Sequence, residues 1–224
     1  MLIDKTYFKG DLLIPNLNEP NPDENTTAVN LDELIDKVEE EVLSFSFGVK
    51  MWLDFKAKYE EDSTNLPQNY KDLLYGKTYT SEANGREETL VWKGLIQETK
   101  KESLLAYIVY VVYNMHNVTQ TTMFGQTKID TKVGTAVSIS PKMARIYNDF
   151  IYQLYGEVRS DRSGLTLEGN PYWNLGRGID YRGFKSTNGY VSLVKYLLDN
   201  VEDYPLFDAN YLKFGGEITN EFGL

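Results

Sequence analysis

The sequence predicts a mainly α protein: a small helical bundle with one β-hairpin and extended ends. Apolar residues recur at steps of three and four in several segments, which is typical of amphipathic helices. Asn84-Gly85 lies between two short runs of β-type residues and indicates a hairpin turn. Proline and asparagine crowd the start of the chain and disfavour regular structure there. We therefore expect an extended arm over residues 1–29, a helical domain over residues 30–205 and an extended tail over residues 206–224.

The first helix is predicted to begin after Asn30, a favourable N-cap residue that Glu33 follows three positions later. Its apolar face is expected to contain Leu31, Leu34, Ile35, Val38, Val42 and Phe45. Its other face carries a single lysine, Lys37, among the carboxylates Asp32, Glu33, Asp36, Glu39, Glu40 and Glu41. Such a charge run is usually a solvated face, and the alternative is an acidic wall of a central lumen, with Glu33, Asp36 and Glu40 as candidates.

The next segments are expected to form two shorter helices and the hairpin. Residues 49–60 repeat the helical pattern, with Gly48 as a possible interruption. Pro67 is positioned to open a short helix that Gly76 closes. The hairpin is then expected at about residues 77–93, anchored on the body by Trp92, because a two-stranded hairpin alone is only marginally stable.

The segment from residue 101 to residue 156 is predicted to be helix, long loop and helix, and the rest of the chain is expected to be organised around it. The apolar stripe of the first helix consists of Leu104, Leu105, Ile108, Val111, Val112 and Met115, widened by Tyr107, Tyr110 and Tyr113. A helix that is apolar on nearly all sides is buried in its own domain or against a neighbouring subunit. Ser140-Pro141 is a strong start signal for the second helix.

The loop over residues 117–139 is long for a compact domain, and such loops are usually functional or interactive. Its threonines and valines favour extended backbone. Two alternatives follow: pairing with a strand of the next copy of the protein, or a local hairpin that covers the chain's own helices. Residues 157–188 are expected to be an irregular loop, and Val191 to Val201 mark a last helix that ends at Tyr204-Pro205.

Composition limits the classes of function. The formal net charge of -10 argues against binding nucleic acid by phosphate neutralisation, although it is compatible with lining a passage through which DNA slides. The chain has no cysteine, which excludes disulfides and thiolate chemistry. No apolar run is long enough to span a membrane, and the first residues lack the pattern of a signal peptide. We expect a soluble intracellular protein with no membrane contact.

The search for catalytic chemistry yields no candidate. His116 is the only histidine, so a metal site built on a pair of histidines cannot form. No G-x-S-x-G or Walker A motif occurs, and no carboxylate pair can be nominated as acid and base. We therefore expect a protein that is not an enzyme and has no catalytic, cofactor-binding or metal-binding residues.

The abundance of tyrosine, 17 residues, is typical of surfaces that meet other surfaces. Basic loop residues could in turn dock on an acidic partner. The candidate residues for an interface with another subunit or a partner protein are Tyr107, Tyr110, Thr121, Thr122, Phe124, Lys128, Lys132, Tyr211, Phe214 and Phe222.

Five stretches of the sequence form a recognisable succession: LLYGKTYTSEANGREETLVWKGL, ESLLAYIVYVVYNMHNVTQTTMFGQTK, SPKMARIYNDF, DYPLF and the terminal NEFGL. This succession resembles a family of structural proteins from tailed phages that infect Bacteroidetes. The most telling pieces are Trp92-Lys93-Gly94-Leu95, the helix from Ala106-Tyr107 to Asn117 with Thr121-Thr122 and Gly125 after it, and Ser140-Pro141. The family is the head-to-tail connector, or adaptor, class, and the ring proteins of crAss-like phages are the nearest candidates.

This resemblance implies a helical bundle of the connector type with a long loop or hairpin between helices and extended termini. It implies a ring below the portal, commonly of twelve copies, through which DNA passes between capsid and tail. The expected partners are then other copies of the chain, the portal protein and neighbouring neck or tail proteins. The expected location is the virion neck, after synthesis in the host cytoplasm. The alternative is a non-enzymatic intracellular adaptor that binds a protein through the tyrosine-rich helix.

Overall fold

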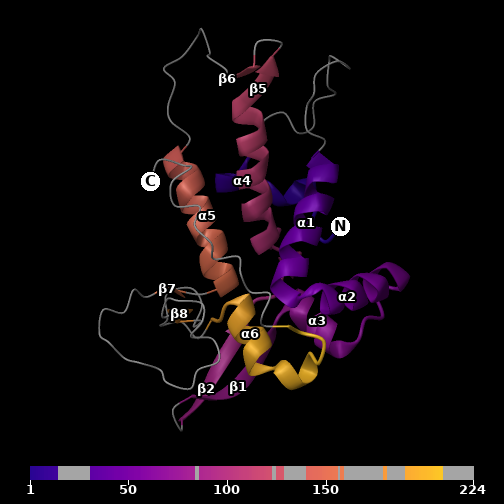
Figure 1. Cartoon of the computed structure of the whole chain (residues 1–224). Coiled ribbons are helices and arrows are strands. Elements are labelled where there is room, and N and C mark those ends of the chain that lie inside the picture. The colour runs from indigo at the N-terminus through magenta and orange to yellow at the C-terminus, as the bar shows by residue number, and fades with distance from the viewer. Residues whose placement is uncertain are drawn as a thin grey trace.

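The computed structural model describes residues 1–14, 31–83, 86–122, 125–128, 140–155, 157–158, 179–180 and 190–208. The protein is mainly helical, as the sequence predicts, and the β-structure of the described residues consists of small antiparallel two-stranded sheets and one parallel bridge between Val91 and Tyr190. Helix α4 lies between α1 and α5, and these three helices form the upright part of the molecule (Figure 1). Helices α2, α3 and α6 and the hairpin β1–β2 gather at its lower end (Figure 1).

Helix α1 (Leu31–Phe47) and helix α2 (Val49–Glu61) meet at Gly48, whose φ of 81° breaks the helical path. The predicted apolar face of α1 is confirmed up to Val42, but Phe45 is 42% exposed, and Leu43 and Phe47 are buried instead. The buried side turns toward α2 at this end because the Phe47 ring packs edge-on against Phe55, with 6.2 Å between the centroids.

The N-terminal segment packs on its own chain. An extended arm was expected over residues 1–29, whereas residues 1–14 contain two short 3-10 turns, η1 (Lys5–Tyr7) and η2 (Gly10–Leu12). Turn η2 contacts α4. The apolar side chains of the segment that join the common core are Leu2, Ile3, Tyr7, Phe8, Leu12 and Ile14. Residues 15–29 lie outside the described residues.

Helix α3 (Gln68–Tyr75) follows Pro67 and ends at Gly76, as predicted. The predicted hairpin is also confirmed: β1 (Lys77–Ala83) pairs with β2 (Arg86–Trp92) in a register that matches Lys77 with Trp92. Trp92 is buried, and its indole Nε1 donates a hydrogen bond to the Leu73 carbonyl over 2.9 Å. The hairpin is therefore anchored on α3, in the way that the sequence suggests for Trp92.

Helix α4 (Leu104–Val118) begins three residues later than expected, because β4 (Glu102–Ser103) pairs with β3 (Ile96–Gln97). The Ser103 hydroxyl accepts a hydrogen bond from the Leu105 amide, which gives the helix its first-turn cap. Most of the stripe of α4 is buried as predicted, but Met115 near the far end is exposed. The helix is enclosed by its own domain along its first two turns.

A second hairpin extends from the end of α4. Strand β5 (Thr119–Thr122) pairs with β6 (Gly125–Lys128), and the hairpin lies beyond the helical bundle at the top of the molecule (Figure 1). The first part of the long loop therefore forms a local hairpin, which is the second of the two alternatives. Residues 129–139 lie outside the described residues.

Helix α5 (Ser140–Tyr155) and helix α6 (Leu193–Asp199) complete the core. Val201 was expected in this last helix. It lies instead in the 3-10 turn η4 (Val201–Asp203) that follows α6, and it is 50% exposed. Within the expected irregular loop, β7 (Glu157–Val158) pairs with β8 (Ile179–Asp180). Of the expected tail, only residues 206–208 are described.

Candidate interaction surfaces

The tyrosines of α4 face the interior of the chain itself. Tyr110 is only 3% exposed, and the Lys142 ammonium of α5 lies 5.0 Å from the centroid of its ring. Tyr107 is half-buried, and burial raises the pKa of its hydroxyl. These two candidate interface residues thus pack within the bundle formed by α1, α4 and α5, and Tyr110 offers no surface to a partner in this conformation.

The other interface candidates fall in or near the hairpin β5–β6 or outside the described residues. The register places Thr121 opposite Gln126, Thr122 opposite Gly125 and Lys128 opposite Thr119. Phe124, Lys132, Tyr211, Phe214 and Phe222 lie outside the described residues. The structure therefore brings Thr121, Thr122 and Lys128 together on one small sheet, separate from the two tyrosines of α4.

Within the described residues, the sheet β5–β6 has two strands, so each strand has one edge without a strand partner. Its strand sequences, TQTT and GQTK, contain no large apolar side chain that could anchor the sheet on a core. An unpaired strand edge is a template for pairing with another chain. The hairpin is therefore suited to strand addition by a neighbour.

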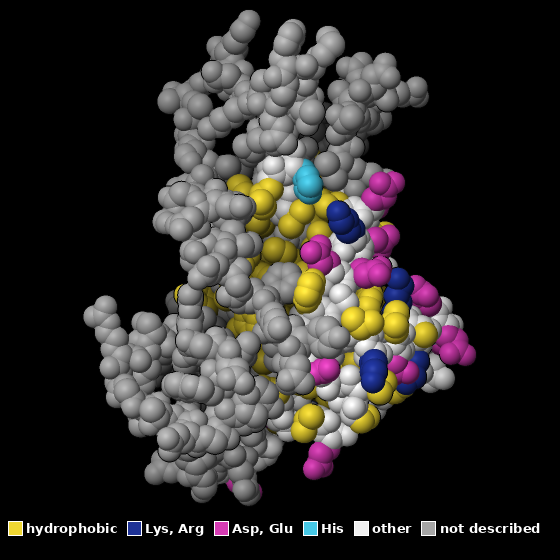
Figure 2. All heavy atoms as spheres, in the orientation of Figure 1, with side chains coloured by type: hydrophobic (Ala, Val, Ile, Leu, Met, Phe, Trp, Pro, Cys, Tyr) yellow, Lys and Arg dark blue, Asp and Glu magenta, His cyan; other side chains and the backbone are white. Residues whose placement is uncertain are grey.

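The three acidic candidates on α1 are all exposed, and Figure 2 shows acidic side chains over α1 and α2. Glu40 forms an ion pair with Lys56 of α2, with 3.4 Å between the Glu40 Oε2 and Lys56 Nζ atoms. Glu33, Asp36 and Glu40 thus share one exposed helix face, as the sequence predicts. A surface of this charge repels the phosphates of DNA.

Glu39 was expected on the solvated acidic face of α1. That prediction is wrong, because Glu39 is only 4% exposed. Its carboxylate accepts hydrogen bonds from the backbone amides of Leu2 and Ile3 at 2.9 to 3.0 Å. Burial raises the pKa of Glu39, and the amide bonds act in the opposite direction. The signal was available in the spacing, since Glu39 lies midway between Ile35 and Leu43, one helical turn from each buried residue.

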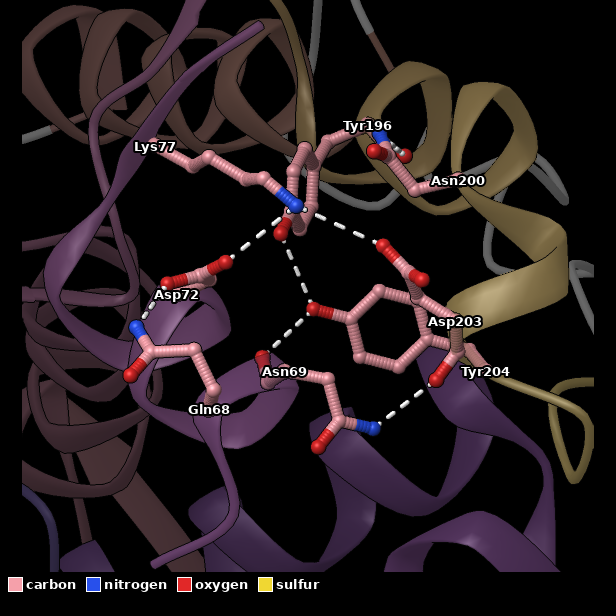
Figure 3. A network of polar contacts seen from close by, with 8 residues as sticks. All are labelled: Gln68, Asn69, Asp72, Lys77, Tyr196, Asn200, Asp203 and Tyr204. Carbon is pink, nitrogen blue, oxygen red and sulfur yellow. Dashed lines mark hydrogen bonds and ion pairs between the residues drawn. The ribbon is translucent and has the colours of Figure 1, made fainter.

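A polar network joins α3, β1, α6 and η4 (Figure 3). The Tyr204 hydroxyl donates to the Asn69 carbonyl over 2.6 Å, so its oxygen is free to accept from the Tyr196 hydroxyl over 2.9 Å. Lys77 lies 3.2 Å from Asp72 and 3.4 Å from Asp203. The network closes where the Asn69 side-chain amide donates to the Asp203 carbonyl over 2.8 Å.

The protonation states in this network favour a structural role. Burial raises the pKa of Tyr196 and Tyr204 above the ordinary value of 10.0, so both hydroxyls stay protonated even in alkaline solution. Burial alone would lower the pKa of Lys77, but its contacts with Asp72, Tyr196 and Asp203 outweigh that effect and raise it. The charged ammonium and the two neutral phenols therefore brace the lower end of the molecule, and the sequence offered no pattern that paired these tyrosines.

Among the described residues, no cluster of three or more histidine, cysteine, aspartate or glutamate side chains could hold a metal ion. No helix in the described parts of the chain is long and apolar enough to cross a membrane. No family model, curated protein or solved structure matches this chain.

Proposed function

We propose that this protein is a structural, non-enzymatic subunit of a phage head-to-tail connector ring, located in the virion neck below the portal. The observation that carries the proposal is the hairpin β5–β6, which projects from the central helix beyond the folded body and has unpaired strand edges within the described residues (Figure 1). The sequence resemblance to connector proteins supports the same role. Neighbouring copies, commonly twelve in that family, would join through this hairpin and leave a central passage for DNA.

The charge of the chain supports the passage. A ring through which DNA slides should not grip phosphates, and the exposed α1 face with Glu33, Asp36 and Glu40 is suited to such a wall. A head-to-tail contact between identical subunits closes into a ring when the rotation between them closes. Ordering the segments at an interface costs conformational entropy. Contacts made on the portal are expected to offset that cost and so stabilise the ring.

The adaptor alternative required the tyrosine-rich helix as a binding surface. Helix α4 instead lies between α1 and α5, and Tyr110 is buried there. The burial of Tyr110 removes much of the surface on which that alternative depends.

Electron microscopy of assembled particles tests the proposal. The expected result is density for this chain as a ring between portal and tail, with the hairpin β5–β6 in contact with an adjacent copy. A particle whose neck is fully accounted for by other proteins would remove the proposed function.

A further inference from the structure

A basic hollow of about 360 Å³ lies where the end of α3 meets the ends of the hairpin β1–β2. Its lining includes three lysines, Lys77, Lys93 and Lys100, and no carboxylate, and Lys77 also pairs with Asp72 and Asp203 behind it. Two exposed aromatic residues, Tyr75 and Tyr190, complete the rim, and the Lys93 ammonium lies 4.2 Å from the centroid of the Tyr190 ring. Positive surface of this kind stands out on a chain of net charge -10.

The floor of the hollow is fixed by close backbone packing. A Cβ atom on Gly76 would lie 2.6 Å from the Trp92 carbonyl oxygen, and one on Gly94 would lie 2.5 Å from the Leu74 carbonyl oxygen. Both glycines also have positive φ, 100° and 90°, which other residues rarely adopt. The end of α3 and the segment after β2 are therefore in direct backbone contact at these two glycines. The hollow above this contact is part of the fold and does not need a partner to form.

An acidic tip occurs at the far end of α2, which turns away from α1 toward the edge of the molecule (Figure 1). All six residues from Glu60 to Asn65 are exposed. Glu60 and Glu61 make no ion pair with any described residue. Carboxylates in the last turn oppose the helix dipole at a cost of about 0.3–1 kcal/mol each, so their position does not serve the stability of α2.

We propose that the acidic tip of α2, Glu60 and Glu61, docks into the basic hollow at Lys93 and Lys100 of the next copy. This inference rests on the proposed ring, and it names one contact that would close it. The two surfaces are complementary in charge and in form, since a protruding helix end meets a hollow. They also occupy different parts of the molecule, as a head-to-tail contact requires. Elsewhere the acidic surfaces of two copies repel, so this pairing also sets their orientation.

Charge reversal tests the contact by sedimentation of the full chain across a concentration series at low and high salt. We expect weak self-association at low salt that high salt disrupts. The tip variant is Glu60→Lys/Glu61→Lys and the hollow variant is Lys93→Glu/Lys100→Glu. Each should raise the dissociation constant for self-association at least about tenfold, which corresponds to about 1.4 kcal/mol. The matched controls Glu41→Lys/Glu87→Lys and Lys9→Glu/Lys50→Glu change the same charge at other exposed sites and should leave the contact in place.

Mixing adds a sharper readout. An equimolar mixture of the tip variant and the hollow variant should recover association and form species larger than pairs, because the Lys tip of one fits the Glu hollow of the other and the Glu tip of the second fits the Lys hollow of the first. The fourfold variant that reverses both surfaces should recover self-association. Thermal unfolding of each variant shows whether the chain still folds.

A wild-type chain that stays monomeric at low salt would overturn this inference, as would tip and hollow variants that behave like their controls. Density for the chain in the particle neck is measured separately. A ring seen there without the tip in the hollow would therefore reject this contact and leave the proposed function standing.

Discussion

The hairpins β1–β2 and β5–β6, the longer ones in the described residues, have the same topology and opposite relations to the core. In β1–β2, Trp92 is buried and stacks on Tyr196 of α6 at 5.6 Å between ring centroids, and Tyr79 contacts the same ring at 5.7 Å. In β5–β6, the strands carry threonine, glutamine, glycine and lysine and lie beyond the bundle (Figure 1). A two-stranded hairpin without packing is marginal. The first hairpin is therefore part of the folded body, and the second is suited to a partner.

The largest expected effect is on the anchored hairpin. Trp92→Ala removes a buried indole, its stacking on Tyr196 and its hydrogen bond to Leu73, and should lower the free energy of unfolding by about 3–5 kcal/mol. Urea unfolding measures this. Thr121→Ala in the second hairpin is the control and should change stability by less than about 0.5 kcal/mol. Similar losses for both variants would erase the distinction between the hairpins.

A smaller effect is expected for the tyrosine pair that supports the first hairpin. Tyr196→Phe removes the hydroxyl that donates to Tyr204 and keeps the ring that stacks on Trp92. The expected loss is about 1 kcal/mol in the free energy of unfolding, the usual net value of one hydrogen bond. Tyr190→Phe, on an exposed ring, should have no measurable effect. A loss as large as that of Trp92→Ala would show that the hydroxyl pair, and not the stacked rings, holds the hairpin.

The N-terminal segment allows a test by pH, because Glu39 holds residues 2 and 3 on α1. Its pKa is raised in the folded state, so the folded protein binds the proton more tightly than the unfolded chain. Stability from this group is therefore lost as pH rises from the ordinary value of 4.5 through the raised value, and it returns on acidification. Wild type should gain stability relative to Glu39→Gln as pH falls from neutral through that window.

Thermal unfolding of both proteins at several pH values measures this difference. A gap between wild type and Glu39→Gln that stays constant with pH would contradict the raised pKa. The hairpin β5–β6 should be insensitive to the change, since Glu39 lies on a different element.

Removal of the hairpin β5–β6 is expected to have the smallest effect on stability and the largest effect on assembly. Replacing residues 119–128 with a short glycine-serine linker removes the hairpin β5–β6 and no described core side chain. The unfolding midpoint in urea should stay nearly constant, while incorporation of the chain into the neck of particles should fail. A variant that unfolds would show that the hairpin belongs to the body after all.

The strongly periodic parts of the fold could be predicted from the sequence. α2 and α3 follow from the spacing of Met51, Trp52 and Phe55 and from the pair Pro67 and Gly76, and those signals are local. The hairpin anchored by Trp92 was also predictable, because its turn and its aromatic anchor are adjacent in the chain.

The misses depend on contacts between distant segments. The spacing of Glu39 places it on the buried side of α1, but the partners that satisfy its carboxylate there, Leu2 and Ile3, lie more than 30 positions away. Phe45 was assigned to the core because periodicity alone does not show that α1 turns its buried side toward α2 at Gly48. The interface candidates on α4 had the right character for burial, but periodicity does not tell a chain's own core from a subunit contact.

Hydrogen exchange of the free and the assembled chain tests the central claim most directly. In the free chain, the amides of β1–β2 should be protected, and those of β5–β6 should exchange rapidly. In chain assembled into necks, the amides of β5–β6 should become protected while those of β1–β2 stay as they were. Hairpin β5–β6 amides that are equally protected in both states, or exposed in both, would contradict the account.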